Sequence, residues 1–161
     1  MRSAFDDIDA DARARIIRVH ETLKAAKAPR PRVAVLARGE PVVAAGDWVP
    51  EMVKRAGGID VLAVANAAAV ETTLDALRAA DPEILLIAPT GHDLPRAAAE
   101  AERLLALDGW TFARERQVFA LDAVALLSQP GPRLIDGIEV MARLFNPQLF
   151  SPLDLAVARA I

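Results

Sequence analysis

The feature of this sequence that most restricts its fold is a series of short apolar runs separated by helical patterns. RVAVLA (residues 32–37) and EILLIAPTG (83–91) are typical of strands buried on both faces of a sheet, and weaker runs occupy 59–64 and 117–121. Strands that alternate with helices at this spacing form right-handed βαβ units around a parallel sheet. We therefore expect an α/β fold, a three-layer sandwich whose mostly parallel sheet has about four strands.

Capping residues, prolines and glycines set the expected helix boundaries. Apolar residues at helical spacing after an Asp-rich start predict a long N-terminal helix over about residues 9–27. GDWVPEMVKRAGG (residues 46–58) predicts a second helix, with Asp47 as its N-cap and Gly57 and Gly58 as its left-handed stop. Further helices are expected after a capping-box Thr72, after a capping Asp93, from near Pro132 to Phe145, and in the tail from Ser151.

Length and charge limit the domain organisation and the partners. A chain of 161 residues is expected to form one core, with an N-terminal helix in residues 1–31, an α/β body in 32–147 and a tail with a short helix in 148–161. The net charge of −3, without Lys/Arg runs interleaved with aromatics, argues against nucleic acid as a partner. The sequence contains neither an 18-residue apolar run nor a secretory signal, so we expect no transmembrane segment and, on this ground, a cytoplasmic location.

The residue types present exclude thiol chemistry and argue against an enzyme that acts on a small molecule. The chain has no cysteine, which rules out thiol catalysis and cysteine-based zinc sites. His20 and His92 are its only imidazoles, and neither belongs to a metal-ligand motif or to a base–nucleophile pair. The glycine-rich phosphate-binding motifs are also absent. We therefore expect a non-enzymatic binding or interaction module, with no catalytic residue and no metal site.

The expected sheet also predicts where a ligand would bind. In open α/β sheets ligands bind outside the carboxyl ends of the strands. The functional surface should therefore be built from the loops at residues 38–48, 65–72, 89–93 and 122–129. Trp48 is a large amphipathic side chain in the first of these loops, and His92 belongs to the third.

Three segments in register resemble a known family. GDWVPEMVKRAGG, TTLDALRAADPEILLIAPTG and SQPGPRLIDGIEVMARLFNP are similar to the C-terminal lobe of the periplasmic substrate-binding proteins that serve ABC importers for cobalamin, haem and iron-siderophores, and most similar to the cobalamin-binding members. The resemblance covers residues 32–147. It implies a Rossmann-like periplasmic binding protein fold of two lobes joined by a long helix, with the ligand clamped between them. The N-terminal helix would then be the remnant of that interlobe helix, and only one lobe is present here.

The resemblance also implies roles for individual residues. It gives candidate ligand contacts in three loops: Gly46, Asp47, Trp48, Thr90, Gly91, His92 and Asp122. In the family, a glutamate near this position docks onto arginines of the permease. Asp75 takes its place here and has a shorter side chain. The ligand expected from the family is a corrinoid, haem or ferric siderophore, and no other cofactor is expected.

Two functions remain open on these grounds. The first is a single-lobe relative of ABC-importer substrate-binding proteins that binds a metal chelate with a separate N-terminal lobe or as a homodimer, and that contacts an ABC permease. The second is a non-enzymatic protein-interaction or scaffold module that has lost ligand binding, which the alanines at residues 67–69 favour. The family resemblance implies a periplasmic location, whereas the missing signal implies the cytoplasm.

Overall fold

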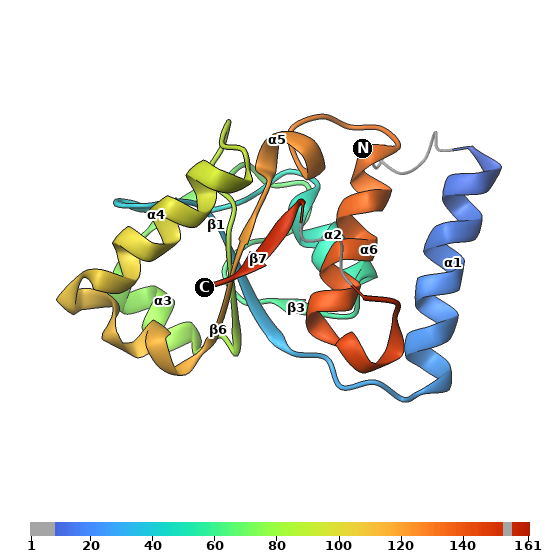
Figure 1. The fold of residues 1–161 in the computed structure, drawn as a ribbon, viewed down its shortest axis with the longest axis horizontal. Coiled ribbons are helices and arrows are strands. Elements are labelled where there is room, and N and C mark those ends of the chain that lie inside the picture. Colours follow the sequence, from blue (N-terminus) through green and yellow to red (C-terminus); the bar gives the residue numbers. More distant parts are fainter. Residues whose placement is uncertain (1–8, 153–155) are drawn as a thin grey trace.

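A mixed sheet separates two layers of helices in the computed structural model, which describes residues 9–152 and 156–161 (Figure 1). The described residues form one seven-stranded sheet. Its strands are β1 (Arg32–Gly39), β2 (Val42–Ala44), β3 (Ile59–Asp60), β4 (Val70–Thr72), β5 (Ile84–Ile87), β6 (Gln117–Leu121) and β7 (Ala158–Ala160). The order across the sheet is β4-β2-β1-β5-β6-β7, and β3 pairs with the beginning of β1.

The centre of the sheet is parallel and its margins are antiparallel. β5 pairs in parallel with β1 on one side and with β6 on the other. β2 runs antiparallel to both β1 and β4, and β7 runs antiparallel to β6. The predicted three-layer α/β sandwich is confirmed, but the expected number of about four strands is too low. The additional strands β2, β4 and β7 are only three residues long, too short to produce a recognisable apolar run.

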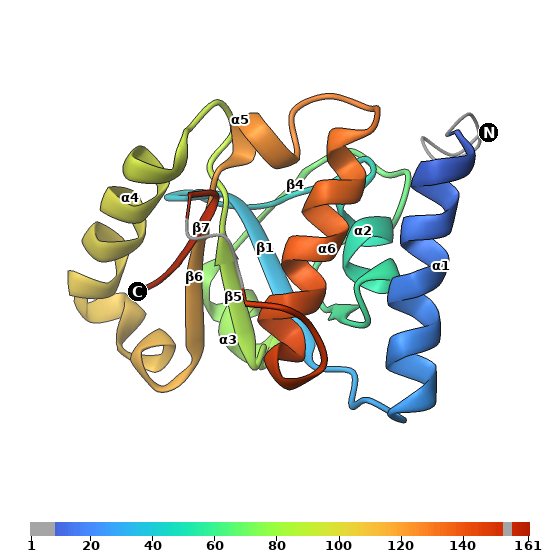
Figure 2. The same cartoon turned by 45° about the vertical axis from the view of Figure 1, so that its right-hand side comes forward.

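Helices cover both faces of the sheet (Figures 1 and 2). One layer contains α1 (Ala10–Ala25), α2 (Val49–Arg55) and α6 (Arg133–Phe145), and the other contains α3 (Leu74–Ala80), α4 (Leu94–Ala106) and the 3₁₀ segment η1 (Asp108–Glu115). The short helix α5 (Ala123–Leu126) follows β6, and the 3₁₀ turn η2 (Pro147–Leu149) follows α6. The helix predicted in the tail is wrong at Ala158–Ala160, which form β7, and its residues 153–155 lie outside the described residues.

Alternate side chains of the central strands enter different cores. Val33 and Val35 of β1 belong to the apolar cluster beneath α1, α2 and α6. Their neighbours Ala34 and Leu36 belong to the cluster beneath α3, α4 and η1. Both sets are buried, as predicted from the continuous apolar run in RVAVLA.

The capping predictions were partly right. The Asp93 carboxylate caps α4 as predicted, accepting a hydrogen bond from the Arg96 N–H, and the Asp9 carboxylate caps α1 in the same way at the Ala12 N–H. The predicted cap at Thr72 is wrong: Thr72 belongs to β4, and the Thr73 hydroxyl accepts from the Ala76 N–H at 3.0 Å. The competing demand of the sheet edge moves the start of α3 one residue along the chain.

An ion-pair network fastens α1 to α6. The Arg15 guanidinium donates from Nε to Glu139 Oε1 at 3.0 Å and from Nη2 to Glu139 Oε2 at 2.7 Å, and Nη2 also lies 2.6 Å from Asp136 Oδ1. This hydrogen bonding lowers the pKa of Glu139 below its ordinary value, against the opposing effect of burial. The forked geometry of arginine suits such a bidentate contact.

Replacing Arg15 with glutamine is expected to lower the free energy of unfolding by about 1 kcal/mol at neutral pH. A carboxyl group whose pKa is lowered by folding stabilises the protein above its unfolded pKa and loses this effect as the pH falls through the folded pKa. The difference between the wild type and Arg15→Gln should therefore disappear in acid, below the ordinary pKa of 4.5 for Glu139. Urea unfolding from neutral to acidic pH measures this difference in the free energy of unfolding. Arg96→Gln, at an exposed position, is the control. A difference that stays constant with pH would contradict the assignment.

Candidate functional site

The loops at the carboxyl ends of the central strands enclose a hollow of about 230 Å³. Each of the four loops predicted from the topology rule contributes to its lining. Much of the wall is methyl groups, since five of the lining residues are alanines: Ala37, Ala45, Ala69, Ala88 and Ala123. The polar side chains are those of Asp47, Thr90 and Ser128. The hollow is thus a shallow apolar surface with few polar groups.

The loop before α2 forms one wall and is bound tightly to the alanine loop. The Asp47 N–H donates to Ala67 O at 2.6 Å, and the Asn66 N–H donates to Asp47 O at 2.9 Å. Gly46 is buried, and a Cβ at this position would overlap the backbone of Ala68 and Ala69. Only a glycine therefore permits the two loops to approach this closely.

The predicted cap at Asp47 is wrong. Asp47 has a φ of +56°, and α2 begins after Trp48 without a side-chain cap. The left-handed conformation of Asp47 turns the chain into the helix, and its side chain stays exposed beside the hollow. At the other end of α2, Gly57 has the predicted positive φ of +92°, and Gly58 does not.

Trp48 is a fixed part of the wall. Its side chain is half-buried against the core beneath α2 and α6. The indole Nε1–H donates to the Leu127 carbonyl at 2.9 Å, across to the loop between α5 and α6. Trp48 can therefore offer a ligand its ring surface, because its hydrogen-bond donor is already used within the protein.

The other predicted contacts divide between the lining and its support. Thr90 lines the hollow and is exposed. Gly91, His92 and Asp122 are not among the lining residues. The Asp122 carboxylate accepts from the Ala125 N–H at 2.8 Å and so caps α5, while the His92 carbonyl accepts from the Ala123 N–H at 3.1 Å. Asp122 and His92 thus hold the loop after β6 in place, although His92 Nδ1 is buried without a hydrogen-bond partner in the described structure.

Most residues of the lining were not predicted individually, among them Leu127 and Ser128. Leu127 and Ser128 lie just after α5, and the Ser128 hydroxyl donates to Ala123 O at 2.7 Å. The available signal was the spacing of Asp122 and Ala125, which is that of an N-cap and its N3 residue. A four-residue helix is too short for apolar periodicity to reveal.

The chemistry of the hollow suits binding. Among the residues that the structure describes, no group of three His, Cys, Asp or Glu side chains is placed to hold a metal ion. Among the described residues, Asp47 is the only charged one that lines the hollow. Apolar walls with a few hydroxyl groups and one carboxylate can hold the body of an organic ligand and orient its polar groups.

Asp75 occupies the first turn of α3, away from this lining. Its side chain is 89% exposed and lies 3.1 Å from Arg78 Nη1, one turn along the helix. A single exposed pair of this kind contributes little to stability. Asp75 is therefore free to contact another molecule without loss to the fold. No helix in the part of the chain that the structure describes has the length and apolarity needed to span a membrane.

Solved structures resemble this chain, whereas no protein-family model and no curated protein matches it. A periplasmic heme-binding protein from Pseudomonas aeruginosa is 26% identical, with a TM-score of 0.71, over 91% of this chain and 55% of that protein. An ABC transporter substrate-binding protein from Listeria monocytogenes EGD-e is 20% identical, with a TM-score of 0.72, over 85% of this chain and 55% of that protein. The periplasmic vitamin B12-binding protein BtuF of Vibrio cholerae is 18% identical, with a TM-score of 0.56, over 84% and 51%.

These matches cover most of this chain and about half of each relative. The relatives are periplasmic or ABC-transporter binding proteins, in agreement with the resemblance of the three sequence segments. A match to about half of each relative is consistent with one of two lobes. The chain therefore has the fold of one lobe of the periplasmic substrate-binding proteins that serve ABC transporters.

Proposed function

We propose that this chain is one lobe of a substrate-binding protein and binds a metal chelate, namely haem, a corrinoid or a ferric siderophore. The observation that supports this most is the convergence of all four strand-end loops on one hollow, in a chain 26% identical to a heme-binding protein over 91% of its length. The ring surface of Trp48 would contact the flat or apolar part of the chelate. Asp47 and Thr90 would meet its polar groups at the rim.

The hollow requires a second surface to enclose such a ligand. Its volume of about 230 Å³ lies below the roughly 300–1,000 Å³ that is usual for sites that bury a drug-sized molecule. In this proposal the opposite wall comes from a separate N-terminal lobe or from a second copy of the chain. The isolated lobe would then bind the chelate weakly, because half of the surface that would be buried between the protein and the ligand is missing.

The proposed role is carriage of the chelate without chemical change. The heme- and vitamin B12-binding relatives are binding proteins, which favours a non-enzyme here. Delivery would involve an ABC permease, with the exposed Asp75 as the candidate docking residue and the periplasm as the location. Corrinoid binding is the closest alternative within the same class, and haem is the first ligand to test because the heme-binding relative has the higher TM-score.

A haem titration tests the proposal. Haem added to the wild type should shift the haem Soret band in a saturable way. Thr90→Trp fills the hollow from an exposed position and should weaken binding by about tenfold or more, which corresponds to the loss of one good contact surface. Thr111→Trp is the matched control, because Thr111 is exposed in η1 and does not line the hollow.

The outcomes separate the possibilities. Equal affinity of the wild type and Thr90→Trp would place haem elsewhere on the protein and contradict the proposed site. No spectral change with haem, cobalamin or a ferric hydroxamate at high micromolar concentration would overturn chelate binding as a whole.

A protein-interaction or scaffold role is the second candidate. Five alanines in the lining and the use of the Trp48 N–H by Leu127 leave few groups that could recognise a ligand, which favours this role. It predicts no response to any chelate. It also predicts that light scattering gives a molar mass above the 17.2 kDa of one chain, either for the protein alone or with a partner protein. A chelate response that Thr90→Trp weakens would exclude it.

A further inference from the structure

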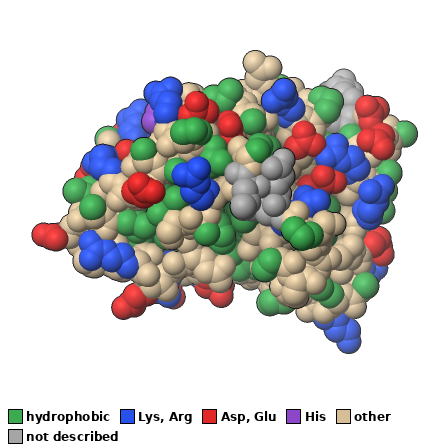
Figure 3. Space-filling view, viewed as in Figure 1, with side chains coloured by type: hydrophobic (Ala, Val, Ile, Leu, Met, Phe, Trp, Pro, Cys, Tyr) green, Lys and Arg blue, Asp and Glu red, His purple; other side chains and the backbone are tan. Residues whose placement is uncertain are grey.

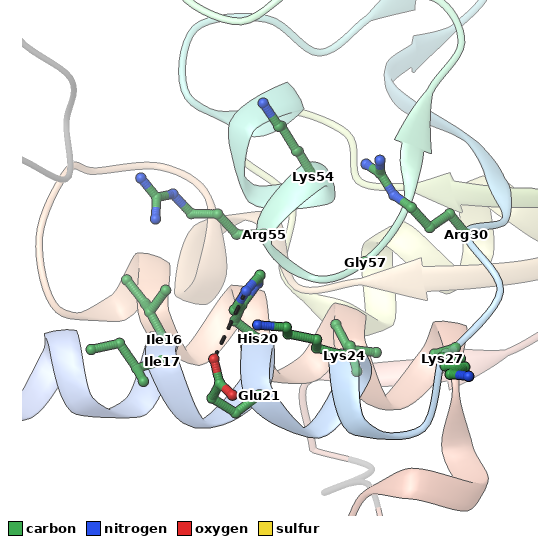
Figure 4. Close-up of a pocket in the computed structure, with 12 residues that line it drawn as sticks. Ile16, Ile17, His20, Glu21, Lys24, Lys27, Arg30, Lys54, Arg55 and Gly57 are labelled. Carbon is green, nitrogen blue, oxygen red and sulfur yellow. Dashed lines mark ion pairs between the residues drawn. The ribbon is translucent and has the colours of Figure 1, made fainter.

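A groove outside the strand-end site runs between α1 and α2 (Figure 4). Its volume is about 570 Å³, more than twice that of the hollow at the strand ends, and the two share no lining residue. α1 contributes one wall, while the end of α2 and the segment at Arg30 contribute the other. In Figure 4 the side chain of His20 rises from α1 towards α2, whereas that of Lys24 runs along α1.

The floor of this groove is apolar. Ile16, Leu23 and Ala28 lie along it, and Ile17 lines it with 59% of its surface exposed. α1 approaches the turn after α2 at Gly57, where a Cβ would lie only 2.8 Å from Leu23 Cδ1. The floor is thus closed beneath by contact between Leu23 of α1 and this turn, and an apolar molecule could rest on it.

All three lysines of the chain line this groove. Lys24 lies in the last turn of α1, Lys27 lies in the turn that follows α1, and Lys54 belongs to α2. No hydrogen bond or ion pair of their ammonium groups is found within residues 9–152 and 156–161, and Glu21 is the only acidic residue in the lining. By contrast, the face drawn in Figure 3 mixes acidic and basic side chains. The groove therefore combines an apolar floor with uncompensated positive charge.

A second hollow of about 700 Å³ continues the groove past Arg30 and Lys54. Ile59 and Val64 line it and are 42% and 73% exposed. Its two acidic side chains have local partners, although Asp60 Oδ2 is buried without one among the described residues. Asp60 Oδ1 accepts from two backbone N–H groups at 3.0 Å each, and Glu51 pairs with Arg55 at 2.7 Å. The apolar surface is therefore longer than the first hollow alone, while its free charge remains positive.

We propose that this groove binds an amphiphilic organic anion, a molecule with an aliphatic or aromatic body and a carboxylate or sulfonate head. The volume lies within the range of small-molecule sites, and exposed apolar side chains at such a place mark ligand grooves. The body rests on Ile16, Ile17 and Leu23, and the head meets the ammonium groups of Lys24 and Lys54. A protein partner would need a far larger surface than this groove offers, and a nucleic acid would leave the floor uncovered.

Binding of 8-anilinonaphthalene-1-sulfonate to the full chain tests the proposal, with displacement by laurate. Its fluorescence should rise in a saturable way, and laurate below its micellar concentration should reverse the rise. Lys24→Gln/Lys54→Gln should weaken both ligands by about tenfold, because the charge-assisted contacts are lost. Arg96→Gln/Arg159→Gln removes the same charge from exposed positions outside the groove and should bind as the wild type does. Thermal unfolding of each variant verifies that the fold is retained.

Lysine acetylation gives a second readout that needs no variant. Because the chain has only three lysines, mass spectrometry follows the groove alone when lysines are modified. Laurate should slow acetylation of Lys24 and Lys54. Equal affinities of the wild type and the lysine variant, or acetylation unchanged by laurate, would overturn the proposal. Cosedimentation with phosphatidylglycerol vesicles without any binding of free laurate would also overturn it and would identify a membrane surface as the occupant.

This inference is independent of the proposed function. Haem itself carries an apolar body and carboxylates, so both sites are to be titrated with it. Loss of haem binding in Thr90→Trp alone locates haem at the strand ends. Loss in Lys24→Gln/Lys54→Gln alone locates it in the α1–α2 groove, which would support the groove and contradict the strand-end site.

Discussion

Replacing Trp110 with alanine is expected to lower the free energy of unfolding by about 3–5 kcal/mol. Trp110 is 2% exposed in the core beneath α3, α4 and η1, and its ring stacks on Phe112 with 6.1 Å between the centroids. Arg78 in turn lies over the Phe112 ring at 5.4 Å. Removing the indole leaves a cavity that the surrounding helices can only partly close. A loss of this size is a large part of the roughly 5–15 kcal/mol that stabilises a domain.

Trp48→Phe is the control for this substitution, because Trp48 is the only other tryptophan. Its loss removes the hydrogen bond to Leu127 O and little buried volume, and it should cost about 1 kcal/mol. Urea unfolding followed by circular dichroism compares the two variants. If Trp110→Ala proved no more destabilising than Trp48→Phe, the helices over that face would have to be packed more loosely than the structure describes.

Gly46→Val should be the second most damaging change, lowering the free energy of unfolding by about 2–3 kcal/mol. A Cβ at this position would overlap the backbone of Ala68 and Ala69 and lie 2.6 Å from Ala67 O. Backbone atoms cannot move aside as a flexible side chain can, so the loop at residues 66–69 has to separate from Asp47. The two hydrogen bonds between these loops would break, and the wall of the strand-end hollow would open.

Gly91→Ala is the matched control at the same edge of the sheet. Gly91 has a φ of +76°, and a Cβ there would have no atom within 4 Å, so the substitution strains only the backbone, by about 1 kcal/mol. Thermal unfolding measures stability, and the fluorescence of Trp48 reports the opening of the wall. A Gly46→Val protein as stable as Gly91→Ala, with unchanged fluorescence, would show that the loops are not held together as described.

The central strands were predictable because consecutive residues in them are apolar, which indicates burial on both faces of the sheet. RVAVLA and EILLIAPTG supply side chains to both cores, and the sequence of β6 shows a similar run. The margins of the sheet were not predictable. β2, β4 and β7 have three residues each, so they owe their extended form to the strand beside them and not to a pattern of their own.

The candidate site was predicted at the level of loops but not of side chains. Strand order alone is sufficient to bring four loops to one edge of the sheet. What each side chain does there depends on local competition. Asp47 adopts a left-handed turn instead of capping α2, and the Asp122 carboxylate caps a helix too short to be recognised. Such outcomes are decided by backbone groups that only the folded chain brings within reach.

The position of the lysines also determines how this protein can be handled. Reagents that attach to side-chain amines can react only at Lys24, Lys27 and Lys54, all in the α1–α2 groove. The strand-end hollow has no lysine in its lining. A chain coupled to a surface or a dye through these amines would therefore keep the hollow chemically unmodified, while the groove itself would be blocked. Lysine coupling thus offers a simple way to study one of the two surfaces with the other out of use.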